Sequence, residues 1–176
     1  MAGCNSGYNY ADTDVQATPV TPIVPESFDF GAFAEYEAAR EQSCRCFWQA
    51  RSGVAVYRRV RVKDVFLDGC RSMRQSLELQ LGGLQKSMDY AADIPNFLEP
   101  WYGIGVGVSA FGVEYIWNEG QAPAYRPKFQ SVSEALAYEP QPIAETAIGK
   151  MILETIDYFL EKTDGRLPIS LTDVQS

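Results

Sequence analysis

The chain contains no histidine, no long apolar run and few basic residues. Without histidine it lacks the side chain that most often binds metals in proteins. No stretch approaches the roughly 20 apolar residues of a membrane span, and no apolar leader follows Met1, so the sequence predicts a cytoplasmic protein with no membrane partner. The formal net charge of -8 argues against a nucleic-acid partner, because phosphates are bound by clustered cations.

Cysteine is scarce as well: there are four, at positions 4, 44, 46 and 70. On a helix Cys44 and Cys46 point to different faces, so the two cannot clasp a metal together. We expect reduced, idle thiols, no metal site and no cofactor in this chain.

The basic residues that do occur gather mainly in one segment. It contains Arg51, Arg58, Arg59, Arg61 and Lys63, interrupted by Val54, Val56, Val60 and Val62. We interpret this cluster as a solvated turn rather than as a binding patch.

The chain does have enough apolar material for one domain, since 46% of its 176 residues are hydrophobic and 12% are aromatic. Its first 26 residues are rich in Asn, Thr, Asp and Pro, with Pro19, Pro22 and Pro25 spaced three apart. This spacing predicts an extended or disordered arm over residues 1–26 and a packed domain over residues 27–176.

Two helices are predicted in the first half of the domain. Ser27 or Asp29 would cap a packing helix that runs to about Arg51. Over residues 62–88 apolar side chains recur at intervals of three and four, which predicts the strongest helix of the chain. Two adjacent glycines, Gly82-Gly83, cost about 1 kcal/mol each in a helix interior, so we expect a bend or break there.

The second half of the domain alternates between strand and helix patterns. Residues 93–100 and 113–117 predict short strands, and an apolar stripe from about Ile143 predicts a crossover helix. Residues 167–173 then predict a buried strand that ends in an acid. This order is typical of an α/β fold with parallel pairing.

Three glycines between the first two strands are spaced like part of a phosphate-binding loop. Gly103, Gly105 and Gly107 do not complete a dinucleotide fingerprint, because that motif needs a glycine where Val108 stands. We therefore expect them to allow close packing against a neighbouring strand.

From about Tyr90 onward the chain resembles the N-terminal part of the uroporphyrinogen decarboxylase family, which includes corrinoid-linked methyltransferases. Three landmarks carry the resemblance: Ile94-Pro-Asn-Phe-Leu-Glu-Pro100, Ser109-Ala-Phe-Gly-Val-Glu114 and Gly165-Arg-Leu-Pro-Ile-Ser-Leu-Thr-Asp173. The resemblance covers roughly half of the chain, and it implies a (β/α)8 barrel of about 250 residues or more. The chain would then hold the N-terminal helices and the first β/α units of such a TIM barrel.

The resemblance also implies where a site would lie. Glu99 and Asp173 would be catalytic acids at the carboxyl ends of barrel strands, and Trp101, Tyr102 and Gly103 would bind substrate beside them. The decarboxylase has its catalytic aspartate just ahead of an Ala-x-Gly step, and the corresponding position here is near Gly103, which is not an acid. A helix cap for Asp173 and a solvated loop acid for Glu99 are the alternatives.

Two hypotheses about function follow. In the first, the chain is an enzyme or the N-terminal portion of one, a lyase or methyltransferase acting on a tetrapyrrole or a methylated small molecule. The methyltransferase branch would bring a corrinoid and zinc, held by ligands beyond this chain. In the second, the chain is a non-catalytic fragment or interaction module that self-associates or needs a partner, so we expect a homo-oligomer.

Overall fold

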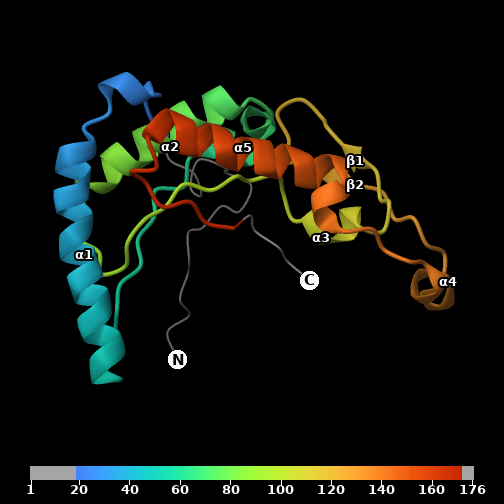
Figure 1. The fold of residues 1–176 in the computed structure, drawn as a ribbon, viewed down its shortest axis with the longest axis horizontal. Coiled ribbons are helices and arrows are strands. Elements are labelled where there is room, and N and C mark those ends of the chain that lie inside the picture. The colour runs from blue at the N-terminus through green and yellow to red at the C-terminus, as the bar shows by residue number, and fades with distance from the viewer. Residues whose placement is uncertain (1–18, 172–176) are drawn as a thin grey trace, which may run out of the picture.

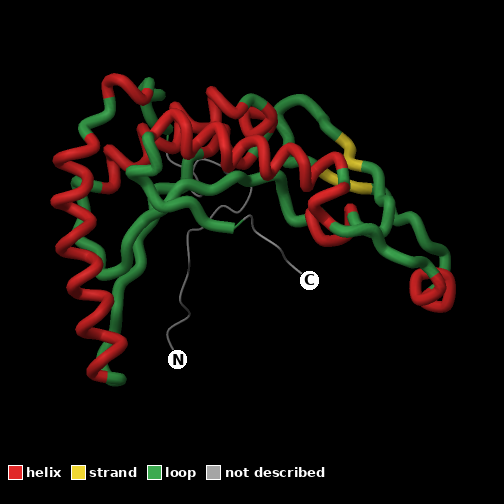
Figure 2. Tube along the Cα trace, in the orientation of Figure 1, coloured by secondary structure: helices red, strands yellow, loops and turns green. Residues whose placement is uncertain are grey.

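The structure is a computed structural model that describes residues 19–171, and its regular structure is mainly helical (Figure 1; Figure 2). The α-helices are α1 (Phe30–Ala50), α2 (Met73–Ser87), α3 (Val106–Ser109), α4 (Val132–Ala137) and α5 (Ala147–Thr163). Short 3-10 helices occupy Pro25–Ser27, Lys63–Phe66, Asp68–Arg71 and Ile143–Glu145. Within the described range the strands are β1 (Tyr115–Ile116) and β2 (Ala124–Tyr125).

The helices α2 and α5 pack together along the long axis of the molecule. In Figure 1, α1 stands at one end of this pair, and α3, the β1–β2 hairpin and α4 form the other end. Extended segments and loops run beside α2 and α5 between these two ends (Figure 2). The molecule is therefore a helical frame with extended segments laid against it.

The predicted partial (β/α)8 barrel is wrong. The strands β1 and β2 pair antiparallel across a turn, with Tyr115 opposite Tyr125, and they form a sheet by themselves. The segments expected as parallel strands meet at one bridge, between Leu98 and Ile169. A short apolar run bounded by turn residues does not distinguish a paired strand from an extended segment packed on helices, and here the second arrangement occurs.

The predicted first helix is confirmed as α1. Asp29 caps it by accepting a hydrogen bond from the backbone N–H of Ala32 at 2.9 Å. The helix ends after Ala50, where Arg51 adopts a left-handed conformation with φ of 52°. A side-chain cap at one end and a left-handed residue at the other explain both boundaries.

The predicted second helix is broken at its beginning instead of near its end. Residues 63–71 form two 3-10 helices, and α2 begins only after Ser72, whose side chain accepts from the backbone N–H of Gln75 at 3.3 Å. The helix then continues through Gly82-Gly83 to Ser87 without a break. A Cβ atom on Gly82 would lie 2.2 Å from the carbonyl oxygen of Thr21, so the missing side chain lets the chain ahead of α1 cross the helix closely.

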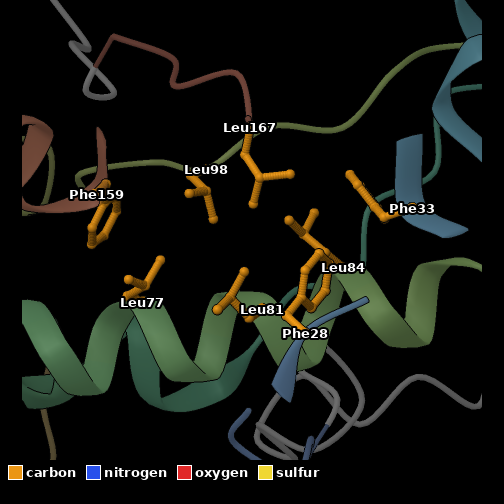
Figure 3. Close-up of a cluster of buried hydrophobic side chains, with 8 residues drawn as sticks. All are labelled: Phe28, Phe33, Leu77, Leu81, Leu84, Leu98, Phe159 and Leu167. Carbon is orange, nitrogen blue, oxygen red and sulfur yellow. The ribbon is translucent and has the colours of Figure 1, made fainter. Parts of the chain in front are cut away.

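The main apolar core lies between α2 and the two extended segments that carry Leu98 and Leu167 (Figure 3). Its members are Phe28, Phe33, Leu77, Leu81, Leu84, Leu98, Phe159 and Leu167. The three leucines of α2 are spaced four and three apart and form one stripe along the helix. Full burial of each such side chain stabilises the fold by about 1.5–3 kcal/mol, so the core holds the segment around Leu98 firmly on α2.

The helix α5 joins this core to a second apolar cluster. Thr146 caps it by accepting from the backbone N–H of Gly149 at 2.9 Å, and the helix ends at Asp164 in a left-handed conformation just before Gly165. Ile148 and Ile152 pack with Trp101, Tyr102 and Val106 in the second cluster. The residues that follow Glu99 are therefore anchored against α5.

Gly103 and Gly105 allow close packing, as expected. A Cβ atom on Gly105 would lie 2.8 Å from a ring carbon of Tyr125 and 3.0 Å from the hydroxyl of Tyr115. These two tyrosines stand on β2 and β1, so the glycine lets the hairpin approach the backbone before α3. No phosphate-binding role is needed to explain this glycine.

Candidate functional site

A groove lies where the extended segment 57–61 passes the segment that follows Leu98. It has a volume of about 580 Å³, within the range of roughly 300–1,000 Å³ that is usual for small-molecule sites. The lining residues are Tyr57, Arg59, Arg61, Phe66, Glu99, Trp101 and Ile104. The groove thus brings two guanidinium groups and one carboxylate together with three aromatic rings.

A buried glutamine of α2 fixes Glu99 in this groove. The side-chain amide of Gln80 donates to the carbonyl of Glu99 at 2.8 Å, and its oxygen accepts from the N–H of Glu99 at 2.7 Å. The same amide nitrogen contacts the hydroxyl of Ser76 at 3.1 Å. The Gln80 amide thus bonds both the N–H and the carbonyl of Glu99, as a neighbouring strand would. These two bonds fix the direction in which the Glu99 carboxylate projects.

The carboxylate of Glu99 is ion-paired. Its Oε2 lies 2.7 Å from Nη1 of Arg59, and the two side chains are 10% and 24% exposed. The guanidinium of Arg59 also lies 4.6 Å from the ring centroid of Phe97. The pair offsets the cost of burying the acid.

Arg61 presents the second guanidinium of the groove. It lies 4.4 Å from the ring centroid of Phe66, which packs edge to face on Trp101 at 5.0 Å. Arg61 is exposed and has no ion-pair partner within residues 19–171. The charge of Arg61 is therefore available to a ligand that lies against the rings of Phe66 and Trp101.

The segment before Lys63 does not form the predicted turn, although Arg61 is exposed to solvent as predicted. The segment is extended, and side chains alternate along it: Tyr57, Arg59 and Arg61 line the groove, whereas Val62 is buried against α2. An extended chain sends successive side chains to opposite sides. The alternation of valine with arginine was the signal in the sequence that could have revealed a two-sided segment.

The structure brings together two of the five predicted site residues, Glu99 and Trp101. Tyr102 is buried in the second apolar cluster, and Gly103 packs against Pro123 with φ of 79°. Asp173 lies outside the described residues. The groove residues that sequence reasoning missed are Tyr57, Arg59, Arg61, Phe66 and Ile104.

The position of Tyr102 favours a structural role. Its hydroxyl is 2.7 Å from Oγ1 of Thr155 on α5, and both side chains are buried. Burial raises the pKa of Tyr102, and the hydrogen bond with Thr155 opposes this only in part. The phenol is therefore protonated at neutral pH and serves to join the segment after Glu99 to α5.

Two further findings concern metals and membranes. Within residues 19–171 no group of three or more Cys, Asp or Glu side chains is gathered as a metal site would require. No helix in this same range is long and apolar enough to cross a membrane.

No family model, no curated protein and no solved structure matches the chain. The resemblance to the uroporphyrinogen decarboxylase family therefore stays a prediction from the sequence landmarks. The functional argument rests on the groove.

Proposed function

We propose that the groove binds a small organic anion that carries a carboxylate on a planar ring. The observation that carries this proposal is the exposed guanidinium of Arg61, which has no ion-pair partner in the described part of the chain. It lies over the ring of Phe66, and Phe66 packs edge to face on Trp101. A guanidinium binds a carboxylate through paired donors, and aromatic walls bind the ring of the same ligand.

The negative charge of the rest of the chain favours the groove as the place where an anion binds. The formal net charge is -8, so most of the surface repels an anion. In the groove the two arginines face one carboxylate, that of Glu99. An anion would therefore be attracted to Arg61 and would compete with Glu99 for Arg59.

The resemblance to the decarboxylase family suggests a carboxylated tetrapyrrole as one ligand of this class. Decarboxylation or methyl transfer stays a further proposal, supported by the presence of Glu99 in the same groove as the arginines. Residues 19–171 offer no cluster that suits the zinc of the methyltransferase branch, and we derive no step through zinc or a corrinoid. A cytoplasmic location likewise stays a prediction.

The proposal is tested by calorimetric titration of the 176-residue chain with isophthalate, a planar dicarboxylate, and with uroporphyrin, a carboxylated tetrapyrrole. Arg61→Ala should weaken binding at least about tenfold, because a hydrogen bond to a charged group contributes about 1.5–3 kcal/mol. The matched control is Arg58→Ala, which removes the same charge three positions away from a side chain that stacks on Tyr90 and does not line the groove.

We expect Arg58→Ala to change the affinity less than about twofold and Arg61→Lys to retain part of it. Binding should also weaken as salt is added, because the groove is open to solvent. Equal losses in Arg61→Ala and Arg58→Ala would mean unspecific attraction to a basic segment, and no measurable binding of either probe would refute the proposal.

A further inference from the structure

The second half of α1 makes few contacts with the rest of the molecule. None of residues 41–50 is buried, and Trp48 is 69% exposed. Its ring packs edge to face on Phe47 at 5.3 Å. In the view of Figure 1 this half of the helix extends beyond the level of α2 and α5. An exposed tryptophan that packs on a neighbouring phenylalanine, on a projecting helix, favours a protein interface.

Four residues of this half share one face, which we call the α1 stripe. They are Glu41, Cys44, Arg45 and Trp48, spaced three, one and three apart, so they follow one side of the helix. Together with Gln49 and Pro95 they line a shallow hollow of about 380 Å³. The stripe thus combines an aromatic ring, a thiol and one charge of each sign.

The charges of the stripe are complementary to those of a second, antiparallel copy. Glu41 and Arg45 pair within the helix at 3.4 Å, but their side chains are 60% and 71% exposed, and such pairs contribute only about 0.3–0.5 kcal/mol. If a second α1 crosses antiparallel, Glu41 of each chain faces Arg45 of the other. A two-fold interface repeats every contact, so one acid and one base on each chain yield two ion pairs.

We propose that the α1 stripe is a homodimer interface, in which two copies of the chain pack antiparallel through Trp48, Cys44 and the exchanged Glu41–Arg45 pairs. The overall charge of the chain favours this surface over others. Two copies with a net charge of -8 repel each other over most of their surfaces, but the α1 stripe carries a balanced charge. The proposal gives a location to the predicted homo-oligomer and is independent of the groove.

Charge exchange between two variants provides a sharp test, read by light scattering after size-exclusion chromatography. We expect the unmodified chain to be a dimer at tens of micromolar concentration. Glu41→Lys and Arg45→Glu should each raise the dissociation constant of the homodimer at least about tenfold, because like charges then meet across the axis. An equimolar mixture of the two variants should form a heterodimer, since the two basic side chains of one chain then face the two acidic side chains of the other.

The mixture also separates the interface from helix stability. Both variants lose the Glu41–Arg45 pair within α1, and mixing cannot restore it. Recovery of the dimer in the mixture therefore reports contacts between chains, while circular dichroism confirms that each variant is helical. A monomeric unmodified chain, single variants that dimerise normally, or a mixture that stays monomeric would each overturn the proposal.

Cross-linking gives an independent readout of the same face. An antiparallel crossing that brings Glu41 opposite Arg45 places the two Cys44 side chains close to the two-fold axis, whereas Cys46 points to another face of the helix. In a Cys4→Ser background, a short bismaleimide should link the chains covalently, and Cys46→Ser should leave this reaction unchanged. Cys44→Ser should abolish it, and cross-linking that persists in Cys44→Ser but is lost in Cys46→Ser would refute the proposed face.

Discussion

Replacing Gly82 by alanine tests the close crossing of the chain at Thr21 over α2. Helix propensity alone predicts that Gly82→Ala stabilises α2 by about 1 kcal/mol. The structure predicts the opposite, because the new Cβ atom would lie 2.2 Å from the carbonyl oxygen of Thr21 and 3.2 Å from its carbonyl carbon. The chain ahead of α1 must then move away by about 1 Å to reach an ordinary contact distance.

The cost of this movement can be worked out from the contacts that would be lost. The N–H of Ile23 donates to the carbonyl of Glu78 at 2.9 Å, a bond that contributes about 1 kcal/mol. Val20 and Ile23 are partly buried against the helix, and forcing extra volume into such a packed contact costs about 1–3 kcal/mol. After the gain of about 1 kcal/mol in helix propensity, we expect a net loss of about 1–3 kcal/mol in the free energy of unfolding.

Urea denaturation followed by circular dichroism measures this loss, with Gly31→Ala in α1 as the matched control. A Cβ atom on Gly31 meets only the Asp29 carboxylate, at an ordinary 3.4 Å, so this variant should gain up to about 1 kcal/mol. Hydrogen exchange should show that the amide of Ile23 loses protection in Gly82→Ala. If Gly82→Ala instead stabilises the chain as Gly31→Ala does, the crossing over α2 does not exist.

Two further predictions concern buried polar groups. Burial raises the pKa of Glu37 above its ordinary 4.5, so the stability that its neutral form provides is complete below pH 4.5 and is lost as pH rises through the higher folded value. Denaturation across a pH series should therefore show the free energy of unfolding of Glu37→Gln rising relative to that of the unmodified chain as pH increases. A difference independent of pH would contradict this. Tyr102→Phe removes the bond to Thr155 and should cost about 1 kcal/mol of stability while leaving isophthalate affinity unchanged. A fall in that affinity would instead place Tyr102 in the binding site, as the sequence predicted.

The elements that the sequence predicted well are those with local signals. Asp29 at the start of α1 and Gly165 just after α5 mark helix ends by their own chemistry. The break before α2 also had a local signal, since Ser72 followed by Gln75 is a capping pattern, but the strong periodicity of residues 62–88 concealed it. The continuation of α2 through Gly82-Gly83 depends on packing against a distant segment, at Thr21, so the local sequence does not predict it.

The candidate site was predictable only in part for a similar reason. Glu99 was predicted as a catalytic acid, with a solvated loop acid as the alternative, and the structure pairs it with Arg59. The identity of that partner depends on how residues 57–61 cross the segment after Leu98, which no local pattern specifies. The barrel prediction failed at this same place, because Gln80 satisfies the backbone of Glu99 in place of a neighbouring strand.

The bridge between Leu98 and Ile169 has a consequence for how the chain folds. Two hydrogen bonds form it, from Leu98 to the carbonyl of Pro168 at 2.9 Å and from Ser170 to the carbonyl of Leu98 at 2.8 Å. They close a long loop that contains the hairpin, α4 and α5. Because the entropic cost of loop closure precedes the reward of the contact, this pairing should form late, after α5 has docked on α2. The two bonds then stabilise a pair of helices that has already folded, and they do not nucleate a sheet.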